Sequence, residues 1–271
     1  AFDDNRFGGY IPEGSDGLMS SCQDCHMPKR VGAACVFEDN PENPQRYDIG
    51  QHSFAGANTW VVGAVKEHFE ANGQGSEITG LTEDRVQAAK ARTVQMLKDA
   101  SDMELSISAG GYLNVRVVNQ TGHKLPTGYP EGRRMWLNVQ FYDQNDALIA
   151  ESGAYDYTKA VLDLAGAKIY EMKAGLSDEV AAATNLPAGE SFHLALNNVR
   201  LFDNRIPPRG ATYKELKSVG AESIPHIYAD NQYWDDTQYI IPAESKNIVT
   251  TLYYQTSTNE YMDFLRNTAQ N

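Results

Sequence analysis

The spacing of hydrophobic positions changes twice along this chain. Residues 1 to about 75 show little regular periodicity and are rich in Gly, Pro, Asn and Asp. Residues 82–100 repeat apolar positions at helical spacing, and from about residue 103 to 256 apolar and polar residues alternate with a period of two. We therefore expect an irregular N-terminal segment, then a helix, then a region of strands.

Two helices are expected within the first hundred residues. The segment 82–100 begins with Thr82, a good N-cap residue, and two acidic residues follow it in the first turn, where they suit the helix dipole. The segment 59–72 (TWVVGAVKEHFEAN) reads as a shorter helix, and its inner side is expected to carry Trp60, Val61, Ala64, Val65 and His68.

Short strands separated by Gly, Pro, Asn and Asp follow. They are expected near 105–108 and at 112–118, 135–142, 147–152, 191–196, 238–241 and 247–254. The tail 259–266 (NEYMDFLR) is expected to be a closing helix with Tyr261, Phe264 and Leu265 turned inward. Strands at this spacing are typical of an antiparallel β-sandwich.

The predicted fold class is therefore α+β. An irregular segment with short helices spans residues 1–80, a linking helix spans 81–102, and a β-sandwich with a C-terminal helix spans 103–271.

Charge and hydropathy exclude several classes of function. The formal net charge is −13 and the sequence pI is about 4.9, so the field of the protein repels nucleic acid and anionic membranes. No apolar run approaches the roughly 20 residues of a membrane span. The first residues (AFDDNRFGG) lack the sections of a signal peptide, so we expect that a signal was removed or that the chain begins inside a longer precursor.

The strongest chemical motif is Cys22-Gln23-Asp24-Cys25-His26. A C-x-x-C-H sequence is typical of c-type haem attachment, in which each thiol adds to one vinyl group of the porphyrin and the histidine binds the iron. A zinc site normally requires a second ligand pair, and a thioredoxin-type thiol pair follows a βαβ strand pattern; neither is found here. We expect haem c on Cys22, Cys25 and His26. Such a large apolar group would also give residues 1–80 a core. Cys35 does not fit the motif, and we expect it to be a buried thiol.

The second axial ligand has two main candidates. His52 lies in the segment QHSFAGAN, which could fold over the other face of the haem with Phe54 against the ring. His123 lies in the loop TGHKLPTG after the strand 112–118, and it could bind this haem or a haem on a neighbouring polypeptide. Further along, Arg205 and Arg209 could pair with haem propionates or with acids of the chain itself.

Several stretches resemble the C-terminal part of multihaem c-type cytochromes, in which a last haem-binding segment precedes a β-sandwich. These stretches are CQDCHMP, RYDIGQHSFAGAN, TGHKLPTGYPEGRRMWLNVQFYD, FDNRIPPRG, YWDDTQYIIP and LYYQTSTNEYMDFLR, and together they cover most of residues 20–266. The resemblance implies bis-histidine iron, with His26 as one ligand and His52 as the histidine of an H-x-F-x-G-x-N element. This chain has one C-x-x-C-H where the family carries several.

These observations predict an electron-transfer protein rather than a catalyst. Its partners would be other haem proteins or a neighbouring cytochrome subunit, in a homo- or hetero-oligomer. Haem c is attached outside the cytoplasm, so a periplasmic or extracellular location is expected. The alternative is the haem subunit of an oxidoreductase or peroxidase, with an open sixth iron position.

Overall fold

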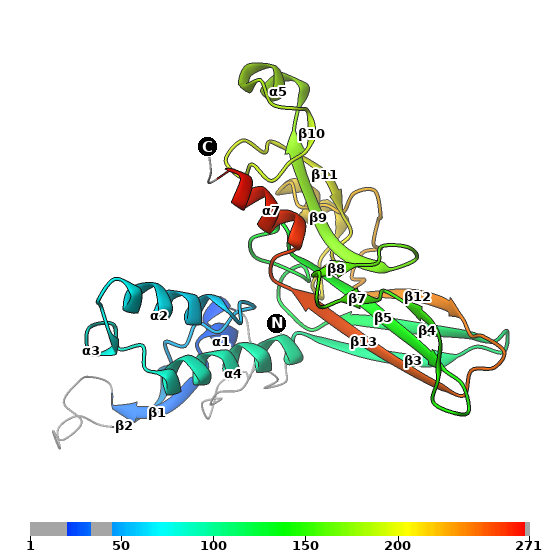
Figure 1. Ribbon diagram of the computed structural model, residues 1–271, viewed down its shortest axis with the longest axis horizontal. Helices are drawn as coiled ribbons and strands as arrows, with labels where there is room; N and C mark the ends of the chain where they lie inside the picture. The colour runs from blue at the N-terminus through cyan, green and yellow to red at the C-terminus, as the bar shows by residue number, and fades with distance from the viewer. Residues whose placement is uncertain (1–20, 34–44, 269–271) are drawn as a thin grey trace. The chain divides into compact units, whose positions relative to one another are not determined.

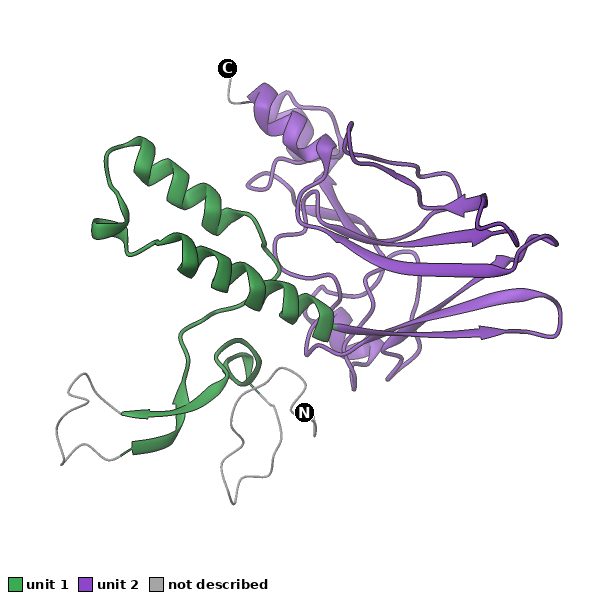
Figure 2. Cartoon of the chain, turned by 60° about the horizontal axis from the view of Figure 1, so that its bottom comes forward, with its two compact units in different colours: residues 1–100 green, residues 101–271 purple. Residues whose placement is uncertain are grey.

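The computed structural model describes residues 21–33 and 45–268. The chain divides into two compact units, Ala1–Ala100 and Ser101–Asn271, which Figure 2 shows in different colours. Cys35 lies outside the described residues.

Unit 1 contains short helices and one β-hairpin. Helix α1 (Cys22–His26) leads into β1 (Lys29–Ala33), which pairs antiparallel with β2 (Gln45–Gly50). Helices α2 (Val61–Ala71), α3 (Ser76–Thr79) and α4 (Glu83–Asp99) follow. Thr82 caps α4 through its side chain, as its residue type predicts. The Nζ atom of Lys66 in α2 lies 3.8 Å from Oε2 of Glu83 in α4, and this ion pair connects the two longer helices.

Unit 2 is built around a six-stranded antiparallel sheet (Figure 1). Its strands are β5 (Arg134–Tyr142), β6 (Leu148–Ser152), β9 (Lys168–Leu176), β10 (Gly189–Glu190), β11 (Val199–Asp203) and β13 (Asn247–Gln255). Strand β13 pairs along one side of β5, whereas β9 and then β6 share its other side. Most residues of β5 are buried, so this strand is the centre of the unit.

A second sheet holds β3 (Ser101–Ile107), β4 (Tyr112–Asn119) and β12 (Trp234–Ile240), with β4 in the middle. Leu113, Val115 and Val117 of β4 are buried at alternate positions, as the period of two predicts. Tyr170 of β9 donates a hydrogen bond to Asp235 of β12, at 3.1 Å, and so joins the two sheets.

The remaining elements of unit 2 are short strands and helices. They are β7 (Tyr155–Asp156), β8 (Val161–Leu162), α5 (Asp178–Thr184), α6 (Tyr213–Ser218) and the C-terminal helix α7 (Asn259–Thr268). Tyr261 and Phe264 of α7 pack against Phe192, whereas Leu265 is exposed. The predicted α+β class, with antiparallel sheets and a closing helix, is confirmed.

Three features differ from the sequence predictions. The segment 191–196 is a turn and not a strand. The Ser191 hydroxyl accepts a hydrogen bond from the His193 N–H, and the Leu196 N–H donates to the His193 oxygen, which makes a turn of the backbone. Strands β9 and β11 lie where the sequence predicts no strand. The expected inner side of α2 is exposed at Trp60, Val61, Ala64, Val65 and His68.

Candidate functional site

The Cys-Gln-Asp-Cys-His motif forms the one-turn helix α1. The Asp24 carboxylate accepts hydrogen bonds from the Ser21 backbone N–H (2.9 Å) and hydroxyl (2.8 Å), which fixes the start of the helix. Because Cys22 and Cys25 are three positions apart, the turn puts both thiols on one side. Cys22 is exposed and Cys25 is half-buried, so one side of α1 presents two thiols next to His26.

The imidazole of His26 is oriented by a backbone carbonyl. Its Nδ1 lies 2.6 Å from the Ala55 oxygen, and because a carbonyl only accepts, Nδ1 carries the proton. The tautomer with Nδ1–H leaves Nε2 as the nitrogen with a lone pair for a metal, an arrangement common among metal-binding histidines. Ala55 is itself buried, which makes this support rigid.

The segment 51–55 is joined to α1 and to the residues after it at two more points. The Gln51 N–H donates to the Pro28 oxygen at 3.0 Å, and the Ser53 hydroxyl donates to the His26 oxygen at 3.5 Å. The β1–β2 pairing brings about this approach, since Lys29 lies opposite Gly50. Two segments about 25 residues apart therefore form one structure around His26.

His52 and Phe54 project from this segment. Both side chains are exposed, and their rings lie 5.8 Å apart in a stacked arrangement. Phe54 adopts a positive φ of 45°, a backbone conformation that residues other than Gly rarely adopt. His52 and Phe54 thus lie on a segment that is hydrogen-bonded to His26 and Pro28.

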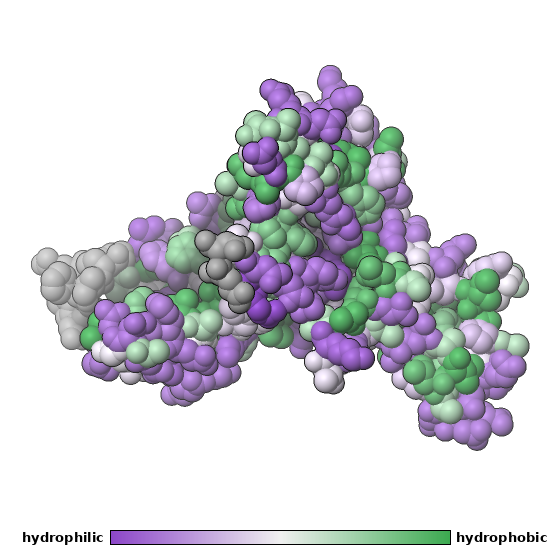
Figure 3. Space-filling model, turned by 45° about the horizontal axis from the view of Figure 1, so that its top comes forward, coloured by the Kyte–Doolittle hydropathy of each residue, from purple (hydrophilic) through white to green (hydrophobic). Residues whose placement is uncertain are grey.

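Unit 1 exposes many large apolar side chains. Its buried hydrophobic residues, within the described ranges, are Ala55, Val86 and Ala100. The exposed ones are Val31, Tyr47, Phe54, Trp60, Val61, Val65, Phe69, Ile78 and Val94. On the face of the whole molecule that Figure 3 draws, hydrophobic residues lie between hydrophilic ones. Exposed apolar surface on this scale suits a large apolar group or a partner.

His123 lies in unit 2 and is held within its own loop. Its Nδ1 lies 3.0 Å from the Thr121 hydroxyl and 3.2 Å from the Lys124 oxygen. Asn119 anchors the loop, because its amide donates to the His123 oxygen and to the Ile206 and Pro207 oxygens. His123 is half-buried.

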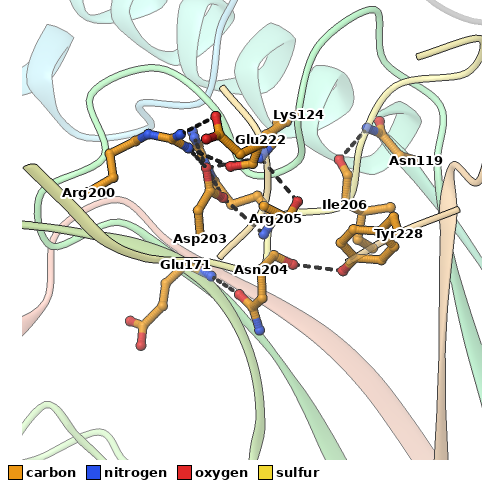
Figure 4. A network of polar contacts seen from close by, with 11 residues as sticks. Asn119, Lys124, Glu171, Arg200, Asp203, Asn204, Arg205, Ile206, Glu222 and Tyr228 are labelled. Atoms are coloured by element: carbon orange, nitrogen blue, oxygen red, sulfur yellow. Dashed lines mark hydrogen bonds and ion pairs between the residues drawn. The ribbon is translucent and has the colours of Figure 1, made fainter. Parts of the chain in front are cut away.

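The arginine loop of unit 2 belongs to a buried ionic network, shown in Figure 4. Asp203 is fully buried and accepts hydrogen bonds from Lys124 (3.0 Å), Arg205 (2.8 Å) and Arg200 (3.4 Å). Burial raises the pKa of Asp203, but the hydrogen bonds and charges of Arg205 and Lys124 outweigh it and hold the pKa below 3.8. Arg205 is thus paired with an acid of the chain, and Arg209 lies 4.7 Å over the Tyr233 ring.

Two other chemistries for the cysteine pair fit poorly. Within residues 21–33 and 45–268, no group of three or more His, Cys, Asp or Glu side chains could hold a metal ion such as zinc. Burial raises the pKa of the Cys25 thiol, and the charges of Asp24 and Cys22 add to this. A thiol-exchange site requires the opposite, a lowered pKa that maintains the thiolate.

Comparisons with known proteins give one distant likeness. No family model matches the chain, and no match is found among curated proteins. The fold is similar to that of a penta-heme cytochrome c552 from Thermochromatium tepidum, with 17% sequence identity and a TM-score of 0.47. The match covers 93% of this chain and 43% of that chain, so this chain spans less than half of that protein's length. In the described parts, no helix is long and apolar enough to cross a membrane.

The contact of His26 with the Ala55 carbonyl is one that the sequence did not predict. Every residue has a backbone oxygen, so no residue type marks the one that will meet His26. Its only sequence signal is indirect, through the hairpin that places segment 51–55 beside α1.

Proposed function

We propose that this chain is a c-type cytochrome that carries electrons on haem c. Cys22 and Cys25 would hold the haem through thioether bonds, and His26 would bind the iron through Nε2. The observation that carries the proposal is the 2.6 Å contact from His26 Nδ1 to the Ala55 carbonyl. It selects the Nδ1–H tautomer next to two thiols at haem-attachment spacing.

The residues around the motif fit a large apolar macrocycle. Unit 1 buries few hydrophobic side chains and exposes several aromatic and aliphatic ones, which a haem would cover. When bound, the haem supplies one-electron chemistry. The chain would orient the imidazole of His26 and shield part of the haem ring from water. The Ala55 hydrogen bond would increase the basicity of the His26 imidazole.

The contacts of segment 51–55 bear on the role of His52. Ala55 approaches the ring of His26 from the Nδ1 side, away from the iron-binding Nε2. His52 is three positions earlier, and three residues span about 10 Å at most when fully extended. Its neighbours Gln51 and Ser53 are hydrogen-bonded to Pro28 and His26. From these contacts we infer that His52 would serve a haem other than the one on Cys22 and Cys25.

We therefore infer that His52 binds the iron of a haem on a neighbouring cytochrome subunit, and that Phe54 packs beside that haem. The second axial ligand of the chain's own haem would come from a partner, and His123 would serve a haem on a neighbouring polypeptide. Both assignments agree with a larger multihaem assembly. Because haem c is attached outside the cytoplasm, the protein would act in the periplasm or outside the cell.

Covalent haem attachment tests the proposal directly. The chain is expressed in the periplasm of a host with c-type maturation machinery and run on a denaturing gel stained for haem. We expect one haem per chain by pyridine haemochrome, and loss of the stained band in the Cys22→Ala/Cys25→Ala double variant. Cys35→Ala is the matched control and should keep the haem. An unstained wild-type chain would overturn the proposal.

A further inference from the structure

Strand β13 (Asn247–Gln255) forms an open edge of the main sheet of unit 2. Among residues 21–33 and 45–268, it pairs with β5 and with no other strand, so it ends its sheet. An edge strand presents a row of backbone N–H and C=O groups on its free side. The strand has nine residues, which makes this edge long enough to hold a second strand.

The sequence of β13 (NIVTTLYYQ) contains no charged residue and no proline. Edge strands are normally protected from pairing by charged residues, prolines or bulges. Other edge strands of unit 2 carry such charges, for example Glu104 in β3, Asp236 in β12 and Glu151 in β6. Strand β13 also pairs with β5 without a shift in register. It is therefore an edge without these protections, which favours pairing with another strand.

The side chains of β13 that face the core are incompletely covered. Thr250 and Leu252 lie opposite Val139 and Leu137 of β5, so they share the face of these residues. Val139 and Leu137 are fully buried, whereas Thr250 and Leu252 are half-buried. A strand added beside β13 would cover the part that remains exposed.

We propose that β13 pairs antiparallel with β13 of a second copy of this chain, around a two-fold axis at Thr251. Thr251 is the middle residue of the strand, so this register pairs all nine residues. Each pair joins two residues of the same face, as a continuous sheet requires, and no like charges meet. The pairs are Thr251 with Thr251, Thr250 with Leu252, Val249 with Tyr253, Ile248 with Tyr254 and Asn247 with Gln255.

The size of this pairing suits a specific dimer. In an antiparallel ladder every second pair exchanges two hydrogen bonds, so the nine pairs supply about eight to ten. A typical protein interface carries about ten direct hydrogen bonds. A slip by one residue would place core-facing side chains opposite outward-facing ones, and a slip by two would shorten the ladder. The symmetric register is therefore favoured over its neighbours.

Sedimentation velocity of the full haem-loaded chain over a range of concentrations tests the dimer. We expect the wild type to dimerise and Val249→Lys to raise the dissociation constant about tenfold or more, because a charge on an edge strand opposes pairing. Val249 is 46% exposed in the single chain, so the variant should fold. The matched control is Ile240→Lys in β12, since Ile240 is 74% exposed and lies on a different edge strand. It should dimerise as the wild type does.

A charge pair at Thr251 tests the register itself. Thr251→Lys and Thr251→Glu should each weaken the dimer about tenfold or more, because two like charges would lie opposite each other at the axis. An equimolar mixture of the two variants should dimerise again, since opposite charges then face each other. Pairing through another surface would not give this recovery.

A wild-type chain that is monomeric at every concentration would overturn the proposal and leave the edge for a strand of a different protein. A dimer that Val249→Lys and both Thr251 variants leave intact would also overturn it. The proposed pairing uses unit 2 alone, so its failure is separate from a failure of haem attachment, which the stained gel measures.

Discussion

At the scale of single residues, His26 shows how a backbone atom decides the chemistry of a side chain. The Ala55 carbonyl takes the Nδ1 proton, so Nε2 is the nitrogen with a lone pair for a metal. The same contact joins His26 to the segment that carries His52. The C-x-x-C-H motif identifies His26 as the candidate ligand, and the Ala55 carbonyl orients its imidazole.

Substitution of His52 tests the assignment of this residue to another haem. In the isolated, haem-loaded chain we expect His52→Ala to leave the optical and electron paramagnetic resonance spectra unchanged, because segment 51–55 stays bound to the His26 side. His52→Ala should instead weaken association with a partner cytochrome. A shift of the isolated chain to high-spin iron would show that His52 binds the chain's own haem.

Asp203 is the buried acid at the centre of the ionic network in unit 2. It is fully buried and is paired with Lys124, Arg205 and Arg200. Asp203→Asn removes the charge that compensates the buried Lys124, so we expect a loss of about 3–5 kcal/mol in the free energy of unfolding. The exposed pair Arg116–Asp236 gives the control, since Asp236→Asn should cost about 0–1 kcal/mol. Urea denaturation measures both.

The Asp203 carboxylate should make the free energy of unfolding depend on pH. Its folded pKa lies below 3.8, the unfolded value, so the folded state holds this proton more weakly than the unfolded state. The stabilisation is then present in full above about pH 4 and is lost as the pH falls through the folded pKa. We expect the difference in unfolding free energy between wild type and Asp203→Asn to shrink below pH 4. A difference that is constant from pH 3 to pH 7 would contradict this.

At the scale of elements, β5 organises unit 2 because it changes partner along one edge. Leu137 lies opposite Lys168 of β9, and Val139 lies opposite Ser152 of β6. Gly153 lies where the partner changes, and its carbonyl accepts hydrogen bonds from Trp136 (3.1 Å) and Asn138 (3.0 Å). These side chains replace the missing ladder contact at the junction.

Gly153 is therefore a position where a methyl group should not fit. A Cβ there would overlap the Leu137 backbone oxygen, whereas a Cβ at Gly166 would meet nothing, and both glycines have a φ near +70°. The left-handed conformation penalises both alanines alike, so the difference isolates the overlap. We expect Gly153→Ala to lower the free energy of unfolding by about 1–3 kcal/mol more than Gly166→Ala does. Thermal denaturation of both variants measures this difference. Equal losses would show that the junction adapts.

At the scale of the whole molecule, the net charge of −13 would influence the rate at which the protein exchanges electrons with charged partners. A strongly negative protein attracts cationic partners and repels anionic ones, and salt screens both effects.

Stopped-flow kinetics on the haem-loaded chain test this effect of charge. We expect a cationic inorganic complex to exchange electrons with the haem faster at low ionic strength and more slowly as salt is added. An anionic complex of similar size should show the opposite trend. Rates that do not depend on salt would mean that the haem edge lies away from the acidic surface. Carbon monoxide binding in the same samples would favour the alternative of an open sixth position.

The sequence alone determined the features that depend on local spacing. The C-x-x-C-H motif, the capped helix α4, the alternation of β4 and the amphipathic helix α7 are each set by neighbours a few positions apart, so their residue types suffice. The segment 191–196 shows the limit of this reasoning. Its alternation suggested a strand, yet a serine hydroxyl and the packing of Phe192 on α7 made it a turn.

Only the tertiary structure decided which distant groups meet. The support of His26 by Ala55 depends on the β1–β2 pairing. The pairing of Asp203 with Lys124 depends on the chain returning to the loop after β4. Backbone carbonyls and buried charges have no sequence period, because their partners are selected by the packing of the sheets.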